Sequence, residues 1–127
     1  METISFQSHS ILVAEDNDDN FEYIWHTLKN TGVNILRAKD GREAVSIVKE
    51  NPAIDLILMD GMMPEMTGYE AAIEIKQMRS DLPIVILTAF VDHSSIREAV
   101  MSGCNDYLAK PIGVEELKAT LSKWLVK

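Results

Sequence analysis

The sequence predicts an α/β fold, a doubly wound parallel sheet with helices on both faces. Four short apolar runs and a weaker fifth recur along the 127 residues. Runs such as ILVA and IVIL show no polar alternation, which is typical of strands covered on both faces. Segments with apolar residues at helical spacing lie between them. A strand–helix order repeated five times favours right-handed crossovers and a parallel sheet.

Each element is predicted from its own stretch of sequence. The expected strands span residues 11–14, 34–38, 54–59, 84–87 and 107–109. The expected helices span residues 20–30, 41–50, 67–79, 94–101 and 114–125, and nearby Gly or Pro residues end several of them. No linker or repeat interrupts this order, so we expect one domain over residues 10–127 after an N-terminal extension over residues 1–9.

Composition excludes several classes of protein. The chain carries 20 acidic and 12 basic residues, a net charge of -8, which argues against a nucleic-acid-binding face because phosphate backbones require Lys and Arg. A single cysteine, Cys104, rules out an internal disulfide framework and suits a reducing compartment. We find no signal peptide and no apolar run long enough to insert into a membrane. We therefore expect a cytoplasmic protein, or a domain at the cytoplasmic face of a membrane.

Chemistry-bearing residues stand where the predicted strands end, the edge at which such sheets bind ligands. The first strand ends in Glu15 and Asp16, the third in Asp60, the fourth in Thr88 and the fifth in Lys110. Clustered carboxylates repel one another, and an oxygen-only ligand set favours Mg²⁺. The stretch EDN alone is typical of helix N-caps and loops. All these residues at successive strand ends favour a metal-dependent site instead.

Four motifs give the sequence a family resemblance over residues 10–126: ILVAEDN, DLILMDGMMPEMTGYE, PIVILTA and GCNDYLAKP. The sequence resembles the receiver domain of two-component response regulators. The stretches AEDNDDN and MDGMMPEMTGYEA are more similar to receivers of hybrid sensor kinases than to those of DNA-binding regulators. The resemblance implies a flavodoxin-like three-layer sandwich with five parallel strands in the order 2-1-3-4-5.

The resemblance also implies a phosphorylation site with a metal ion. Asp60 would accept a phosphoryl group from a histidine kinase or a phosphotransfer protein. Asp16, Asp60 and the main-chain carbonyl of Met62 would bind Mg²⁺ directly, and Glu15 would act through a metal-bound water. Many relatives carry Asp at position 15, so the longer Glu15 is expected to alter that water shell.

Further residues match the phosphate-binding and switch positions of the family. Lys110 would bring a cation to the phosphoryl group, and Thr88 a hydroxyl hydrogen bond. Thr88 and the aromatic Tyr107 would move on phosphorylation and remodel the face beside them. Pro111 matches a position where the Lys–Pro bond is usually cis, which would aim Lys110 into the site.

Such a domain would catalyse only its own phosphorylation and dephosphorylation, as a monomer or a weak phosphorylation-dependent dimer. Met62 and Phe90 stand at the positions that modulate hydrolysis in the family. Both are apolar and cannot orient an attacking water, so we expect slow dephosphorylation.

Phe21 and Trp25 allow two interpretations. With Ile24 and Leu28 they form one helical stripe, which indicates core packing. The resemblance places the core at Ile24 and Leu28 instead, and turns Phe21 and Trp25 toward the rim beside the site. There they would anchor the phosphodonor partner.

Two rival classes share parts of this pattern. A haloacid dehalogenase phosphatase also phosphorylates an Asp after a strand, but it requires a second Asp where this chain has Met62. A flavodoxin-type cofactor carrier requires a phosphate loop after the first strand, and the acidic EDNDDN would repel a phosphate.

Within the receiver family two interpretations stay open. We expect no output domain after residue 127 and therefore no direct DNA binding. The chain is either a single-domain regulator that acts by protein contact or the receiver of a hybrid sensor histidine kinase.

Overall fold

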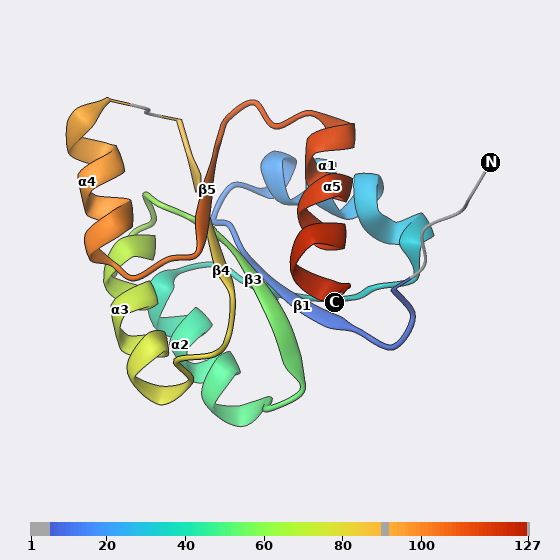
Figure 1. The fold of residues 1–127 in the computed structure, drawn as a ribbon, viewed down its shortest axis with the longest axis horizontal. Helices are drawn as coiled ribbons and strands as arrows, with labels where there is room; N and C mark the ends of the chain where they lie inside the picture. Colours follow the sequence, from blue (N-terminus) through green and yellow to red (C-terminus); the bar gives the residue numbers. More distant parts are fainter. Residues whose placement is uncertain (1–5, 90–91, 127) are drawn as a thin grey trace.

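The computed structural model describes residues 6–89 and 92–126. Within them, five parallel strands form one sheet in the order β2-β1-β3-β4-β5, which confirms the predicted topology (Figure 1). The strands are β1 Ser10–Ala14, β2 Asn34–Ala38, β3 Ile54–Asp60, β4 Ile84–Thr88 and β5 Asp106–Ala109. From β1 the chain adds β2 on one side, and it then crosses back to add β3, β4 and β5 on the other side, so the strand order reverses between β1 and β3. Their carboxyl ends therefore form the switch point where sheets of this kind bind ligands.

Helices cover both faces of the sheet and complete the predicted three-layer sandwich (Figure 1). One face carries α1 and α5, and the other carries α2, α3 and α4. The bounds are α1 Asp18–Leu28, α2 Gly41–Glu50, α3 Gly68–Met78, α4 His93–Met101 and α5 Val114–Leu125. None of the helices in the described residues has the length and apolar character that a membrane span requires.

Two hydrophobic cores result from this layering. Successive strand residues point to opposite faces, so Leu12 packs beneath α2 and α3 while Val13 packs beneath α1 and α5. β3 contributes to both cores, with Ile57 on the first face and Leu58 on the second. Burial on both faces explains why the strands appear in the sequence as continuous apolar runs.

The first helix begins earlier than the periodicity predicts. α1 starts at Asp18 rather than at residue 20, because Asn17 caps it: the Asn17 Oδ1 atom accepts a 2.9 Å hydrogen bond from the Asn20 N–H. Asp18 and Asp19 occupy the first turn, where their charges favour the positive end of the helix dipole. This first turn contains no apolar residues at helical spacing, so apolar periodicity did not predict that the helix begins there. The helix ends at Leu28, and a 3₁₀ turn, Lys29–Thr31, follows.

The strand and helix bounds elsewhere lie within one or two residues of those predicted.

At the N-terminus, Phe6 lies within the expected extension but is only 1% exposed and belongs to the core beneath α1 and α5. Its N–H donates to the Thr31 carbonyl at 2.7 Å. Phe90, one of the two residues expected to modulate hydrolysis, lies outside the described residues.

Candidate functional site

Strand register brings the predicted site residues to one edge of the sheet. Ala14 pairs with Met59, so Glu15 and Asp60 follow on neighbouring strands. Thr88 pairs with Ala109, so Lys110 lies beside the end of β4. The structure thus gathers at this edge the acids, hydroxyl and amine that the sequence predicts there.

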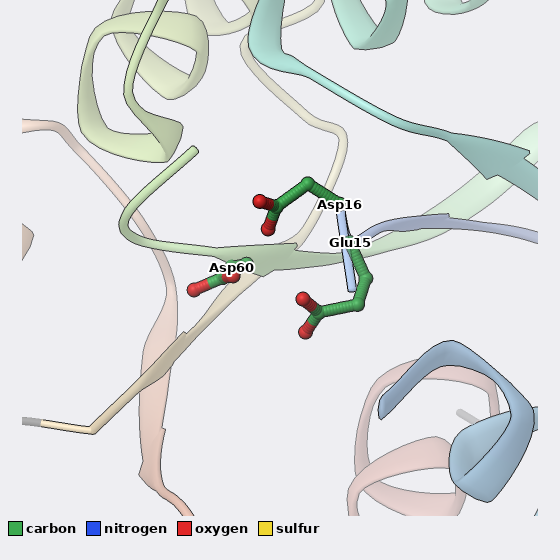
Figure 2. A group of neighbouring side chains, drawn as sticks. All are labelled: Glu15, Asp16 and Asp60. Atoms are coloured by element: carbon green, nitrogen blue, oxygen red, sulfur yellow. The ribbon is translucent and has the colours of Figure 1, made fainter. Parts of the chain in front are cut away.

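Three carboxylates meet at the switch point (Figure 2). One carboxylate oxygen from each of Glu15, Asp16 and Asp60 lies within 4.8 Å of the others. Glu15 and Asp60 are buried, whereas Asp16 is exposed. Within the described residues, no side chain or main-chain group forms a hydrogen bond or ion pair with the Asp16 carboxylate. Its oxygens are therefore available to a ligand.

The Asp60 carboxylate is held from two sides. Its Oδ1 atom accepts a 3.2 Å hydrogen bond from the Met62 N–H, and its Oδ2 atom lies 3.4 Å from the Lys110 Nζ atom. Burial, followed by repulsion from Glu15, raises the pKa of Asp60 from 3.8 to about 6, although Lys110 and the Met62 N–H oppose this. The negative charge of the carboxylates at this edge is therefore not fully neutralised by other groups of the protein.

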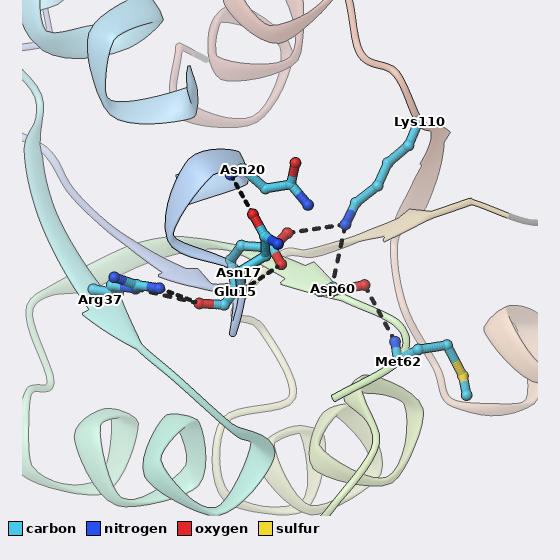
Figure 3. A network of polar contacts seen from close by, with 7 residues as sticks. All are labelled: Glu15, Asn17, Asn20, Arg37, Asp60, Met62 and Lys110. Atoms are coloured by element: carbon cyan, nitrogen blue, oxygen red, sulfur yellow. Dashed lines mark hydrogen bonds and ion pairs between the residues drawn. The ribbon is translucent and has the colours of Figure 1, made fainter. Parts of the chain in front are cut away.

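Lys110 lies closer to Glu15 than to the predicted acceptor (Figure 3). Its Nζ atom donates to Glu15 Oε1 at 2.9 Å, and the Asn17 N–H donates to Glu15 Oε2 at 3.2 Å. Burial lowers the pKa of Lys110, but hydrogen bonding and the charges of Glu15 and Asp60 outweigh it and raise that pKa. Lys110 is therefore a cation that two buried carboxylates share.

This donor set fits a hard divalent cation. The cluster offers three carboxylates against the single Lys110 amine, and a divalent cation relieves the repulsion that raises the pKa of Asp60. Oxygen ligands favour hard divalent cations over softer metals. The Glu15–Asp16–Asp60 cluster can thus hold a metal ion.

Thr88 is buried at the end of β4, and its side chain is hydrogen-bonded to Tyr69 in the first turn of α3. Burial raises the pKa of Tyr69. The Tyr69 hydroxyl packs so closely over Gly61 that a Cβ atom there would lie 2.8 Å from it. Sequence analysis did not identify Tyr69, because an aromatic residue in a helix gives no signal that it contacts a strand end.

The other predicted residues of the site lie on β5 and in the segments that follow β3 and β5. Tyr107 on β5 is 37% exposed, so its ring is at the surface. The Lys110–Pro111 peptide bond is cis, as the resemblance implies. Met62 directs its N–H to Asp60, and its side chain is exposed.

The two aromatic residues of α1 have different surroundings. Trp25 is 40% exposed, with its ring near His26 and Lys29. Phe21 is partly buried against the core beneath α1 and α5. Core packing is therefore wrong for Trp25, whereas Phe21 lies between core and surface.

A groove of about 460 Å³ lies between α1 and the segment after β5. Tyr23 closes one part of it, because its hydroxyl donates to the Ile112 carbonyl at 2.6 Å. The lining residues are Glu15, Asn20, Tyr23, Ile24, Lys110, Pro111 and Ile112. The groove therefore connects the buried charges with the surface of α1.

Arg37, at the end of β2, is a second residue that sequence analysis missed. Its guanidinium donates two hydrogen bonds to the Glu15 carbonyl oxygen (Figure 3). A charged residue within the run NILRA was the one available signal. Nothing in the sequence indicates its partner, because the contact depends on the pairing of β1 with β2.

Known proteins with similar sequences include regulators and sensor kinases. The transcriptional regulatory protein YrkP of Bacillus subtilis is 38% identical over 88% of this chain and 47% of its own length. The osmosensing histidine kinase SLN1 of Saccharomyces cerevisiae is 42% identical over 92% of this chain, and the sensor histidine kinase GacS of Pseudomonas protegens is 34% identical over 97%. This chain covers 10% of SLN1 and 14% of GacS. The chain thus spans less than half the length of these relatives.

Solved structures with the same fold include chemotaxis protein CheY4 of Vibrio cholerae, at a TM-score of 0.84 and 29% identity over 91% of this chain and 98% of that one. A second solved structure contains the receiver domain of Saccharomyces cerevisiae Ssk1 together with the histidine phosphotransfer protein Ypd1. It matches this chain with a TM-score of 0.86 and 33% identity, over 92% of this chain and 88% of that one. The profile of the response regulator receiver domain matches residues 11–122. The chain therefore belongs to the response regulator receiver domain family of two-component systems.

Proposed function

We propose that this receiver domain accepts a phosphoryl group on the Asp60 carboxylate and signals through the resulting change of conformation. One observation carries the proposal: Asp60 is buried at the switch point of the sheet, next to the Lys110 cation and two further carboxylates. Buried acids with a raised pKa and a specific charged partner favour a functional site over a purely structural one.

The reaction is an in-line transfer from a phosphorylated imidazole. A carboxylate oxygen of Asp60 attacks phosphorus, an O–P bond forms and the N–P bond breaks. The bonding pair stays on the imidazole nitrogen, which takes a proton. Lys110 and Thr88 bind the oxygens of the transferred group. Later attack of water on phosphorus releases inorganic phosphate and restores the carboxylate.

The metal that we propose for the carboxylate cluster is Mg²⁺. Asp16, Asp60 and the Met62 carbonyl would hold it directly, and Glu15 through a water. When bound, the ion supplies charge that neutralises the phosphoryl oxygens. Asp60 must be ionised to attack, and the Lys110 cation favours that form.

The proposed phosphodonor is a histidine kinase or a histidine phosphotransfer protein. The exposed Trp25 and the adjoining Phe21 would anchor the donor at the rim beside the site. The Ypd1–Ssk1 structure shows that one similar receiver binds a phosphotransfer protein.

Output would then pass through Thr88 and Tyr107 to a protein partner, with the domain a monomer or a weak phosphorylation-dependent dimer. We propose no direct DNA binding, because the net charge of -8 repels phosphate backbones. We also propose that the domain turns over no separate substrate, and that it works in the cytoplasm or at the cytoplasmic face of a membrane. Relatives of both kinds, regulators and sensor kinases, leave a single-domain regulator and a hybrid-kinase receiver as alternatives.

A small-molecule phosphodonor tests the chemistry without a partner. Intact-mass measurement after incubation with acetyl phosphate should show one added phosphoryl group when Mg²⁺ is present and little in EDTA. Asp60→Asn keeps the shape of the side chain but removes the nucleophile, so it should stay unmodified. A phosphoryl group that persists on the Asn variant would place the acceptor elsewhere.

A further inference from the structure

Arg37 holds the peptide that links two of the three carboxylate residues. The register of β1 with β2 ends where Ala14 pairs with Ala38, and the Glu15 N–H continues it with a 2.9 Å hydrogen bond to the Ala38 carbonyl. The Glu15 carbonyl lies beyond that last pair. It accepts hydrogen bonds from Arg37 Nε at 3.2 Å and from Arg37 Nη2 at 3.0 Å (Figure 3).

The same guanidinium also reaches the first two turns of α1. Its Nη2 atom forms an ion pair of 2.8 Å with Asp18 Oδ1, and the guanidinium lies 4.6 Å from the centre of the Phe21 ring. The Arg37 side chain is 20% exposed and Asp18 is 74% exposed. The contact with the buried Glu15 main chain is therefore better shielded from solvent than the ion pair with Asp18.

We propose that Arg37 is a positioning residue for the Mg²⁺ site, an inference that rests on the proposed function. The Glu15 carbonyl belongs to the peptide that joins Glu15 to Asp16. The orientation of that peptide determines where the Asp16 carboxylate points relative to Asp60. Partners that orient metal ligands typically change metal affinity about 10-fold to 100-fold when they are lost.

The charge of Arg37 and its two hydrogen bonds predict opposite effects on Mg²⁺ affinity when the residue is replaced. A guanidinium near a cation site opposes Mg²⁺ by repulsion, so loss of the charge alone should tighten metal binding. Loss of the two hydrogen bonds should instead weaken binding, because the peptide between Glu15 and Asp16 becomes free to rotate. Arg37→Gln removes the charge, and Arg37→Lys keeps it but lacks the planar two-donor geometry.

Calorimetric titration of the metal-free proteins with Mg²⁺ separates the two effects. We expect Arg37→Lys and Arg37→Gln each to raise the Kd for Mg²⁺ by about 10-fold. Asp18→Asn removes the exposed ion pair but leaves the Glu15 contact, so its Kd should stay within about twofold of the parent value. Circular dichroism and urea unfolding in EDTA show which variants are folded at the titration temperature, and only those variants are compared.

Two results would count against the inference in different ways. If the parent binds Mg²⁺ and both Arg37 variants bind it equally or more tightly, Arg37 acts by charge at most and the positioning role is overturned. If the parent itself binds no Mg²⁺, the metal assignment of the proposed function is overturned together with it.

Discussion

At Asp60, burial and the neighbouring Glu15 carboxylate oppose ionisation, whereas Lys110 and the Met62 N–H favour it. The balance leaves the folded-state pKa at about 6, above the ordinary 3.8. Between these values the folded protein binds more protons than the unfolded chain, so this group lowers the free energy of unfolding as the pH rises from about 4 to 6. The proposed acceptor is therefore a source of instability in the metal-free protein at neutral pH.

Replacement of Asp60 by Asn tests this at the level of one residue. We expect Asp60→Asn to raise the free energy of unfolding at pH 7.5 in EDTA by up to about 3 kcal/mol. The gain should shrink below pH 6 and vanish only below about pH 3, where the parent carboxyl is protonated in both the folded and the unfolded state. Urea unfolding at a series of pH values measures it. A gain that does not change with pH would show that Asp60 ionisation is not its cause.

The residues of the site were largely predictable, but their partners were not. Strand ends in a parallel sheet share one edge, so the positions of Asp16, Asp60 and Lys110 followed from the predicted strands. The nearest partner of Lys110 in the metal-free structure is Glu15, which depends on side-chain length and burial. The Arg37 contact with the Glu15 carbonyl depends on the pairing of β1 with β2, which has no local signal.

At the scale of elements, apolar periodicity located the helices and missed the polar start of α1. The same helix shows how a stripe can mislead. Phe21, Ile24, Trp25 and Leu28 share one side in projection, but Ile24 and Leu28 are buried and Trp25 is 40% exposed. A helix packed at the edge of a layer buries only the centre of its apolar stripe.

The exposure of Trp25 sharpens the test of partner docking. We expect Trp25→Ala to slow phosphotransfer from a phosphohistidine protein, while phosphorylation by acetyl phosphate stays near the parent rate. The loss in unfolding free energy should be below about 1.5 kcal/mol, well under the 3 to 5 kcal/mol typical of a buried Trp. Transfer rates and urea unfolding provide the two measurements.

Trp124 supplies the matched control. It is partly buried in the core beneath α1 and α5, near the residues that begin β3 and β4, at the opposite end of the strands. Trp124→Ala should cost more stability than Trp25→Ala and leave transfer from the phosphohistidine protein unchanged in the folded protein. Equal slowing by both substitutions would rule out a specific docking role for Trp25.

For the whole molecule, the two cores and the sheet fix the site, and the site in turn affects global stability. β1, β3 and β4 are buried on both faces, so their carboxyl ends can move little relative to one another. The buried Glu15 and Asp60 carboxylates are therefore held together whether or not a cation is present. A ligand that binds the folded protein alone stabilises the whole domain by mass action.

We therefore expect Mg²⁺ to raise the free energy of unfolding at pH 7.5 by about 1.4 kcal/mol for each tenfold increase in free Mg²⁺ above its Kd. The increment should decline below pH 6, because protons compete with the metal for Asp60. Thermal and urea unfolding across Mg²⁺ concentrations measure it. Asp16→Asn should reduce the increment, whereas Asp19→Asn removes the same charge from the first turn of α1 and should leave most of it. An equal increment in all three proteins would mean that Mg²⁺ acts by general screening and not at this cluster.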